Sequence, residues 1–326
     1  MLTDAVYSCV GRLSKASVQY LVLTLLAVQN TALILVSKIS YRESAVPYFI
    51  SSVIVLSECF KFILSSVLTL TCSGSSELAR ALREVPSSAI QLALPAVLYV
   101  LQNTLLFEGV RLLSPTVFMV CTQFKILTSA LFAFCMLNKK ITRRQYVALI
   151  LLPTGMICVE KVKDTGSNTP KTLKNGILFV LAATCISGFV GAYLEKIYKD
   201  HFKIRKRSLW SRNVQLATFS VPMSFCTMYW RDGREIASVG LFHGYDAVVI
   251  TLVVLHAAGG LIVAMVVKHA SNVMKCFAVA ISICACELIS VFYWNSNYHT
   301  ERVIGILIVV LATYMYTKEE ITNNTR

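Results

Sequence analysis

Charged residues are scarce in this sequence. Asp, Glu, Lys and Arg make up 15% of the 326 residues, whereas hydrophobic residues make up 56% and the mean hydropathy is +0.65. A soluble protein of 36.1 kDa needs a polar surface, and these few charges cannot cover apolar runs such as residues 18–36. The shortage excludes a soluble globular protein and favours one that crosses a membrane several times.

Patterns that bind metals or perform acid–base catalysis are also missing. The 11 cysteines form no Cys-x-x-Cys pair and no Cys/His set with metal-ligand spacing, and most lie in apolar segments, where cysteine is a small hydrophobe. The sequence has no Asp-x-Asp triplet and no useful pairing of a histidine with an acidic residue. We therefore expect no metal, no cofactor and no catalytic residue. These absences argue against one alternative, an enzyme embedded in the membrane.

Long apolar runs are abundant. A helix needs roughly 20 mostly apolar residues to span a bilayer. By this measure the sequence predicts ten spans, at residues 17–38, 47–70, 88–110, 114–137, 143–160, 174–198, 209–230, 245–268, 272–293 and 299–317. The first run has no small-residue cleavage site, which favours a signal anchor over a cleaved signal peptide. Ten spans rather than seven argue against a second alternative, a receptor.

A polar stretch at residues 161–174 is the best linker, because it combines lysines with Gly, Ser, Asn and Pro. It divides the chain into residues 1–165 and 166–326, with five predicted spans in each part. Halves with an odd number of spans insert in opposite orientations, and related halves of this kind form the inverted repeat of many secondary transporters. We therefore predict an all-α membrane protein, one integral membrane domain with ten transmembrane helices in two inverted five-helix halves.

The net charge of +14 has two possible meanings. In a soluble protein it would suggest nucleic acid, but here the basic residues lie mostly in short loops, so we expect no nucleic-acid partner. The loops on the side of both termini are the more basic, which predicts cytosolic termini, although the lysines of residues 161–174 oppose this orientation. A basic excess also suits an anionic ligand.

Charges inside the predicted spans are few, and each needs a partner or a ligand. Glu58 and Lys61 are three residues apart and share a helix face, so they can neutralise each other beside a cavity or simply hold helices together. Lys125 lies midway along its span with no acidic residue within a turn. We interpret it as a ligand for a visiting anion, and an ion pair with Glu58 or Glu287 is the alternative.

Other polar positions are open to two interpretations. Tyr99, Gln102 and Asn103 offer a ring for stacking and two amides able to read a base edge, or else they join helices by hydrogen bonds. The stretch Ser187-Gly-Phe-Val-Gly-Ala-Tyr193 has small residues that allow close approach to a helix or a ligand. Lys275 follows a short polar break and either faces an anion at a helix start or is an ordinary loop lysine. No role is assigned to His256 or Glu287.

Four stretches together resemble a known family. They are Tyr99-Val-Leu-Gln-Asn103; Gln123-Phe-Lys-Ile-Leu-Thr-Ser-Ala-Leu131 with Met136-Leu-Asn-Lys139; Ser187-Gly-Phe-Val-Gly-Ala-Tyr-Leu-Glu-Lys196 with Leu209-Trp-Ser-Arg-Asn-Val-Gln215; and the region from Gly259 to Lys275. The sequence resembles the nucleotide-sugar transporters of the endoplasmic reticulum and Golgi, in the drug/metabolite transporter superfamily. Its nearest likeness is to the branch that carries UDP-galactose, UDP-N-acetylglucosamine and CMP-sialic acid.

The resemblance implies alternating access and exchange of a cytosolic nucleotide sugar for a luminal nucleoside monophosphate. It also implies the substrate contacts. Tyr99 and Asn103 would contact the base, Lys125 and Lys275 the phosphates, and Asn213 the ribose or base, while Ser187 and Gly188 would line the nucleotide pocket.

Several positions depart from the pattern of CMP-sialic acid carriers. Ala217 replaces a stacking Tyr of these carriers and Phe118-Met119 replaces their Tyr-Gln, while Thr104 replaces the second Asn of a pair that is familiar in the family. The resemblance therefore implies a Golgi membrane transporter of UDP-galactose, UDP-N-acetylglucosamine or both, exchanging them for UMP, with membrane lipid as its surroundings. A CMP-sialic acid/CMP antiporter stays the alternative, and a homodimer and residence in the endoplasmic reticulum stay open.

Overall fold

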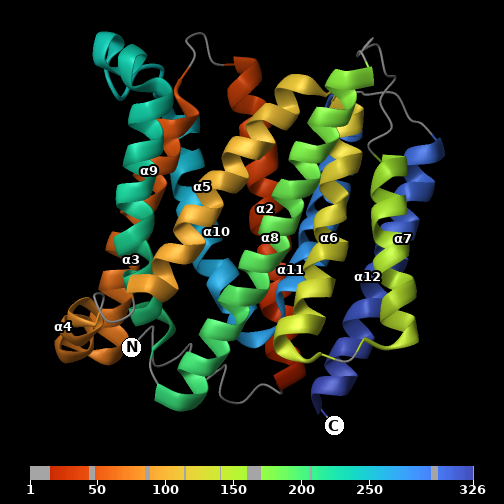
Figure 1. Cartoon of the computed structure of the whole chain (residues 1–326), viewed down its shortest axis with the longest axis horizontal. Coiled ribbons are helices and arrows are strands. Elements are labelled where there is room, and N and C mark those ends of the chain that lie inside the picture. The colour runs from red at the N-terminus through yellow and green to blue at the C-terminus, as the bar shows by residue number, and fades with distance from the viewer. Residues whose placement is uncertain are drawn as a thin grey trace. The chain divides into compact units, whose positions relative to one another are not determined.

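The computed structural model describes residues 15–43, 48–84, 89–113, 115–139, 141–159, 170–205, 208–294 and 300–325. Every regular element within these ranges is a helix (Figure 1). The helices are α2 (Lys15–Glu43), α3 (Ile50–Ser73), α4 (Ser75–Arg83), α5 (Ala89–Leu112), α6 (Pro115–Leu137), α7 (Arg143–Val159), α8 (Pro170–Arg205), α9 (Leu209–Val239), α10 (Ala247–His269), α11 (Asn272–Trp294) and α12 (Thr300–Thr325). All except the short α4 coincide with a predicted apolar range.

Six helices in the described part of the chain are long and apolar enough to cross a membrane. These segments are Ala16–Ser40, Ile50–Ser73, Val120–Leu137, Leu173–Lys199, Ala247–His269 and Asn272–Ile289. They support a helical membrane protein, because a backbone in lipid must satisfy its hydrogen bonds within the segment. The other four predicted ranges fall on α5, α7, α9 and α12, and the count of ten spans stays a prediction.

Several helix ends have a local cause. Ser208 precedes α9 and its hydroxyl accepts a hydrogen bond from the Trp210 backbone N–H at 3.3 Å, as an N-cap does. The same helix ends at Gly240, whose φ of 96° suits a residue without a Cβ. α8 begins at Pro170, a residue favoured in the first helical turn because its missing N–H would have no partner there.

The helices belong to two compact units. Unit 1 combines Val28–Val97 with Tyr198–Lys268, and unit 2 combines Ser14–Ala27, Leu98–Ile197 and His269–Arg326. Each unit takes helices from both sides of the predicted boundary at residue 165. An inverted repeat relates halves by symmetry and not by contact, so the halves 1–165 and 166–326 stay a prediction.

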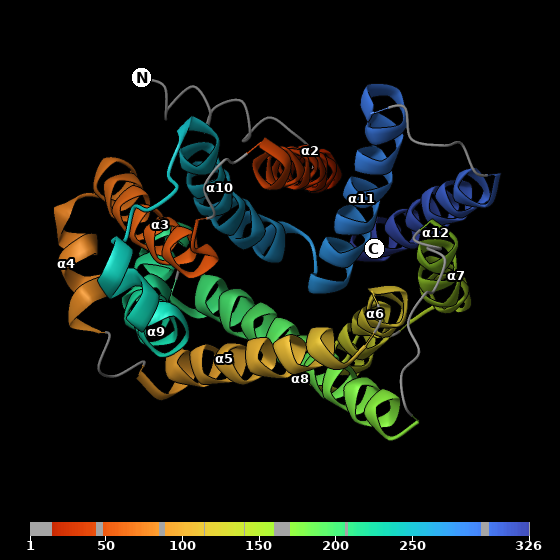
Figure 2. The same ribbon diagram turned by 90° about the horizontal axis from the view of Figure 1, so that it is seen from above.

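Unit 1 is built around the packing of α3 against α9, with α4 beside both (Figure 2). Its described core includes Val53 on α3 together with Val249 and Leu252 on α10. Interhelical hydrogen bonds reinforce it, because the Gln29 side chain donates to the Leu255 carbonyl at 2.9 Å and the Gln215 side chain to the Ala81 carbonyl at 3.0 Å. Buried amides with partners of this kind are common between membrane helices.

Unit 2 contains α6, α7, α11 and α12, and α7 lies along α12 (Figure 2). Gly155 allows this approach. A Cβ at this position would lie 2.9 Å from Ile308 Cγ2 and Val309 Cγ2 and 3.0 Å from the Gly305 carbonyl oxygen. On α11, Phe277 stacks on Tyr316 of α12 with ring centroids 4.5 Å apart, which fixes α11 against the same helix.

Candidate functional site

The two lysines predicted to bind phosphate both belong to unit 2, on α6 and α11. The Lys125 side chain is exposed and the Lys275 side chain is half-buried. α6 packs against α11, and the Cys276 thiol, next to Lys275, donates to the Ser129 hydroxyl, one turn after Lys125, at 3.9 Å. The two like charges therefore lie on neighbouring helices and repel each other. Within unit 2 no described residue forms an ion pair with Lys125. An anion between the two ammonium groups would relieve the repulsion, since a ligand of opposite charge offsets both of them.

The aromatic and amide residues predicted to read the base lie on α5 of the same unit. Tyr99 and Asn103 are both exposed and are four residues apart, so they occupy one face of the helix. The neighbouring Gln102 has a buried Oε1 atom with no hydrogen-bond partner in the described part of the chain. Exposed groups on one face are able to bind a ligand, and their contact with a base stays a prediction.

Gly188 lies where α8 crosses α6. A Cβ at this position would lie 2.7 Å from the Thr128 backbone carbon and 2.9 Å from the Ser129 nitrogen, so only glycine allows the approach. The Thr128 hydroxyl also donates to the Thr184 carbonyl across this crossing at 2.8 Å. Gly188 therefore has a packing role. The pocket-lining role of Ser187, which is half-buried, and of Gly188 stays a prediction.

Asn213 belongs to unit 1 and is 4% exposed. The Tyr198 hydroxyl donates to its Oδ1 atom at 2.7 Å. Its Nδ2 atom is buried and has no hydrogen-bond partner in the described ranges. The tyrosine thus holds the amide with its N–H groups unused, which is the arrangement that a donor to a ribose or base needs.

Glu58 and Lys61 form an ion pair within unit 1, with 2.5 Å between Lys61 Nζ and Glu58 Oε2. The Ser220 hydroxyl donates to the same carboxylate oxygen. Both charged side chains are mostly buried, 15% exposed for Lys61 and 23% for Glu58. The pair neutralises the two charges, and its place beside a cavity stays a prediction.

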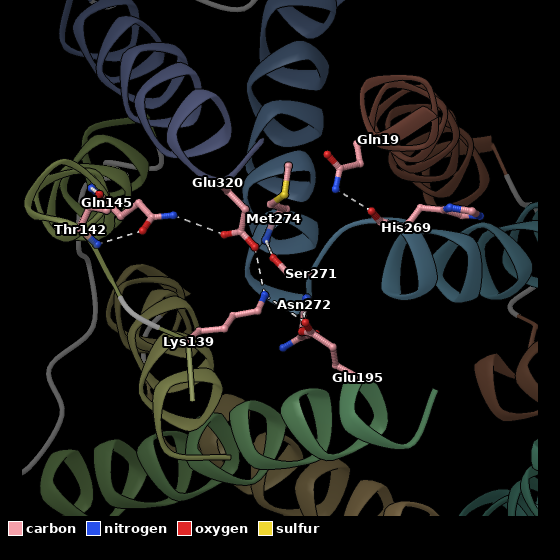
Figure 3. Close-up of polar contacts among 10 residues, drawn as sticks. All are labelled: Gln19, Lys139, Thr142, Gln145, Glu195, His269, Ser271, Asn272, Met274 and Glu320. Carbon is pink, nitrogen blue, oxygen red and sulfur yellow. Dashed lines mark hydrogen bonds and ion pairs between the residues drawn. The ribbon is translucent and has the colours of Figure 1, made fainter. Parts of the chain in front are cut away.

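One charged cluster was not predicted. Lys139 Nζ lies 3.0 Å from Glu195 Oε1 on α8 and 3.0 Å from Glu320 Oε1 on α12 (Figure 3). Burial alone would lower the pKa of Lys139, but the two carboxylates outweigh burial and raise it. Lys139 and Glu195 each lie in a stretch that resembles the family, but no pairing between them was expected. The available signal was Glu195, an acidic residue inside an otherwise apolar stretch.

Among the described residues, no group of three His, Cys, Asp or Glu side chains has the arrangement to hold a metal ion. Unit 2 by itself has two cationic side chains, the amides of Gln102 and Asn103 and the exposed Tyr99. Groups of this kind bind an anionic ligand that also carries a planar, hydrogen-bonding part.

Comparisons with known proteins point to a family. The family model described as nucleotide-sugar transporter matches residues 14–317. A UDP-N-acetylglucosamine transporter of Bos taurus is 35% identical over 92% of this chain and 95% of its own length. A UDP-galactose transporter of Schizosaccharomyces pombe is 34% identical over 93% of this chain and 88% of its own length. A UDP-galactose/UDP-N-acetylglucosamine transporter of Caenorhabditis elegans is 31% identical over 94% of this chain and 84% of its own length.

A solved crystal structure supports the fold alone. It superposes with a TM-score of 0.68 at 12% sequence identity, and the match covers 95% of this chain and 99% of that chain.

Proposed function

This chain belongs to the nucleotide-sugar transporter family, as its resemblance indicated, and from this premise we propose that it carries a UDP-sugar into the Golgi lumen in exchange for UMP. The proposed substrate is UDP-N-acetylglucosamine, UDP-galactose or both, since similar relatives are named for these sugars. The proposed architecture is ten transmembrane helices in two inverted halves with both termini in the cytosol.

One observation supports the proposal more than any other: the like charges of Lys125 on α6 and Lys275 on α11 lie on helices of unit 2 that pack against each other. A charge that is moved out of water without a partner costs several kcal/mol. The negative charge of the diphosphate in a UDP-sugar, or of the monophosphate in UMP, would neutralise these two lysines. We further propose that Tyr99 and Asn103 contact the base, and that Asn213 contacts the base or ribose.

The same lysines favour exchange over one-way transport. An empty site with two repelling cations changes conformation less readily than a site whose cations are neutralised by phosphate. The carrier then returns from the lumen mainly when UMP is bound. The entry of a nucleotide sugar into the lumen is therefore coupled to the exit of UMP.

The choice of UDP over CMP rests on Ala217. Its side chain is fully buried in α9, so the position has no room for the stacking tyrosine that CMP-sialic acid carriers have there. The carriers named for UDP-sugars among the relatives favour the same choice.

Reconstituted protein tests the exchange. Uptake of labelled UDP-N-acetylglucosamine and UDP-galactose should be faster into liposomes preloaded with UMP than into empty liposomes. Equal uptake into both would contradict the exchange. In the same assay, CMP-sialic acid taken up against CMP, with no UDP-sugar uptake, would establish the CMP alternative.

The Lys125→Ala variant tests the site. We expect the half-saturating concentration of UDP-sugar to rise by about ten- to a hundredfold, because a hydrogen bond to a charged group contributes about 1.5 to 3 kcal/mol. The matched control is Lys174→Ala, which removes the same charge from an exposed position on α8. If Lys125→Ala transported UDP-sugar with the same half-saturating concentration as the control, Lys125 would not belong to the substrate site.

Purified protein in detergent distinguishes a carrier from an enzyme. We expect UDP-sugars to be recovered intact after prolonged incubation, because the proposed site has no catalytic group. Release of UMP or free sugar in proportion to the amount of protein would favour the enzyme.

A further inference from the structure

The cluster around Lys139 connects four segments of unit 2 that are far apart in the sequence (Figure 3). Lys139 lies just after α6, Glu195 on α8, Asn272 at the start of α11 and Glu320 near the end of α12. Glu195 is completely buried and Glu320 is 6% exposed. A completely buried carboxylate is costly unless it has several partners, so its contacts indicate what it holds in place.

Glu195 uses its two oxygens for different partners. Oε1 forms the ion pair with Lys139, and Oε2 accepts a hydrogen bond from the Asn272 backbone N–H at 2.8 Å. That N–H belongs to the first turn of α11, where backbone donors have no partner within the helix. A carboxylate at this end also interacts favourably with the helix dipole. Glu195 therefore anchors the beginning of α11.

The contact between α8 and α11 is tight at this point. Gly191 lies one turn before Glu195, and a Cβ there would lie 2.2 Å from Asn272 Nδ2. The Met274 N–H is bonded to the Ser271 hydroxyl at 3.2 Å, which supports the same first turn of α11. The start of the helix is thus held by its neighbour through close packing and a charged hydrogen bond together.

Glu320 holds Lys139 from the other side, and Gln145 in turn holds Glu320. Glu320 Oε1 contacts Lys139 Nζ at 3.0 Å, and Glu320 Oε2 accepts a hydrogen bond from Gln145 Nε2 at 3.5 Å. The Thr142 N–H in turn donates to Gln145 Oε1 at 3.0 Å. The Glu195 and Glu320 carboxylates thus share the ammonium group of Lys139.

The Glu195 carboxylate lies next to the proposed phosphate site. Lys275 is three residues after Asn272, less than one turn further along α11. Glu195 accepts a hydrogen bond from the Asn272 N–H in the same turn of α11, which brings its negative charge near the Lys275 ammonium group. Glu195 thus compensates part of the positive charge when no nucleotide is present.

We propose that Glu195 is a positioning residue for Lys275, which anchors the first turn of α11 and supplies a counter-charge that keeps nucleotide binding weak enough for release. The inference rests on the proposed function, because it assigns a role relative to the phosphate of that same site. Lys139 and Glu320 orient the Glu195 carboxylate and do not contact substrate in this assignment.

The two parts of the role are separated by two substitutions. Glu195→Gln keeps an oxygen for the Asn272 N–H but removes the counter-charge. We expect the half-saturating concentration of UMP to fall by about three- to tenfold and the maximal exchange rate to fall as well, because an anion held by uncompensated lysines leaves slowly. Glu195→Asp keeps the charge, but its shorter side chain no longer reaches the Asn272 N–H. This variant should therefore raise the half-saturating concentration of UMP.

The matched control is Glu319→Gln, the same chemical change on α12 at a carboxylate outside the cluster, which pairs with Arg144 at 3.7 Å. We expect the half-saturating concentration of UMP for this variant to stay near that of the wild type. A loss of folding alone would lower the amount of active protein and the maximal rate without tightening UMP binding. Tighter binding in Glu195→Gln is therefore a result that a merely structural role does not give.

The assay combines UMP binding by calorimetry in detergent with exchange in proteoliposomes. If Glu195→Gln had the same UMP affinity and exchange rate as Glu319→Gln, and the wild type exchanged UMP, the inference would be overturned and the proposed function would stand. Weaker UMP binding by Glu195→Gln would also overturn it. A wild type that neither binds UMP nor exchanges it would overturn the proposed function and the inference together.

Discussion

At the scale of single residues, the roles of charged side chains depend on their partners. Lys125 and Lys139 are lysines on or just after the same helix, yet Lys139 has two carboxylates within 3.0 Å and Lys125 has no ion pair within the described part of unit 2. The first is therefore part of the scaffold, and the second is available to a ligand. Sequence spacing alone recognised the isolated lysine but not the paired one.

The Lys139→Met variant should lose stability in a pH-dependent manner. In the wild type the pKa of Lys139 is raised, so its contribution is complete below the ordinary lysine pKa of about 10.4 and is lost only as pH rises through the higher folded value. Without the ammonium group, the two carboxylates repel and favour protonation. We expect a destabilisation of about 3 to 5 kcal/mol near neutral pH that becomes smaller toward pH of about 5.

Thermal unfolding in detergent across this pH range measures the effect. Lys174→Met, an equal loss of charge at an exposed position, is the control and should change little at any pH. A destabilisation by Lys139→Met that did not vary with pH would contradict the paired-charge explanation.

Ala217 leads to a further prediction at this scale. Because it is fully buried, Ala217→Tyr should destabilise the protein by about 1 to 3 kcal/mol through overpacking, and it should not create CMP-sialic acid transport. Unfolding midpoints and uptake of labelled CMP-sialic acid check the two parts. A stable variant that transports CMP-sialic acid would show that this position has room for a base-stacking ring.

At the scale of helices, small residues decide how closely two elements approach. Gly155, Gly188 and Gly191 each lie where an added Cβ would be under 3.0 Å from an atom of a neighbouring helix. Association of helices in lipid depends on such van der Waals contact, because lipid chains are as apolar as the side chains. The sequence indicated this property for the stretch from Ser187 to Tyr193 but not for Gly155.

Gly155→Ala should separate α7 from α12 and lower the unfolding midpoint, at a cost of about 1 to 3 kcal/mol. The control is Gly233→Ala on α9, where the new Cβ would lie 3.4 Å from the nearest atom of Tyr229, an ordinary contact. There the helix propensity of alanine should leave the protein as stable as before or slightly more so. Equal midpoints for the two variants would contradict the tight α7–α12 contact.

At the scale of the whole molecule, the orientation in the membrane follows from loop charge. We expect a tag at the C terminus to be digested by protease added to sealed Golgi vesicles, and a tag between Gly240 and Asp246, in the α9–α10 connection, to be protected. Both should be digested after detergent is added. Protection of the C-terminal tag would reverse the predicted orientation.

The sequence by itself determined the helices. Every predicted apolar range coincides with a described helix, because bilayer thickness sets the length of an apolar run and its backbone hydrogen bonds are local. It also determined the family, through short motifs whose residues are neighbours in the chain. Tertiary structure alone decided which distant side chains meet. The ion cluster of Lys139, Glu195 and Glu320 joins three separate helical segments, and no local periodicity encodes a contact whose energy appears only when those segments pack.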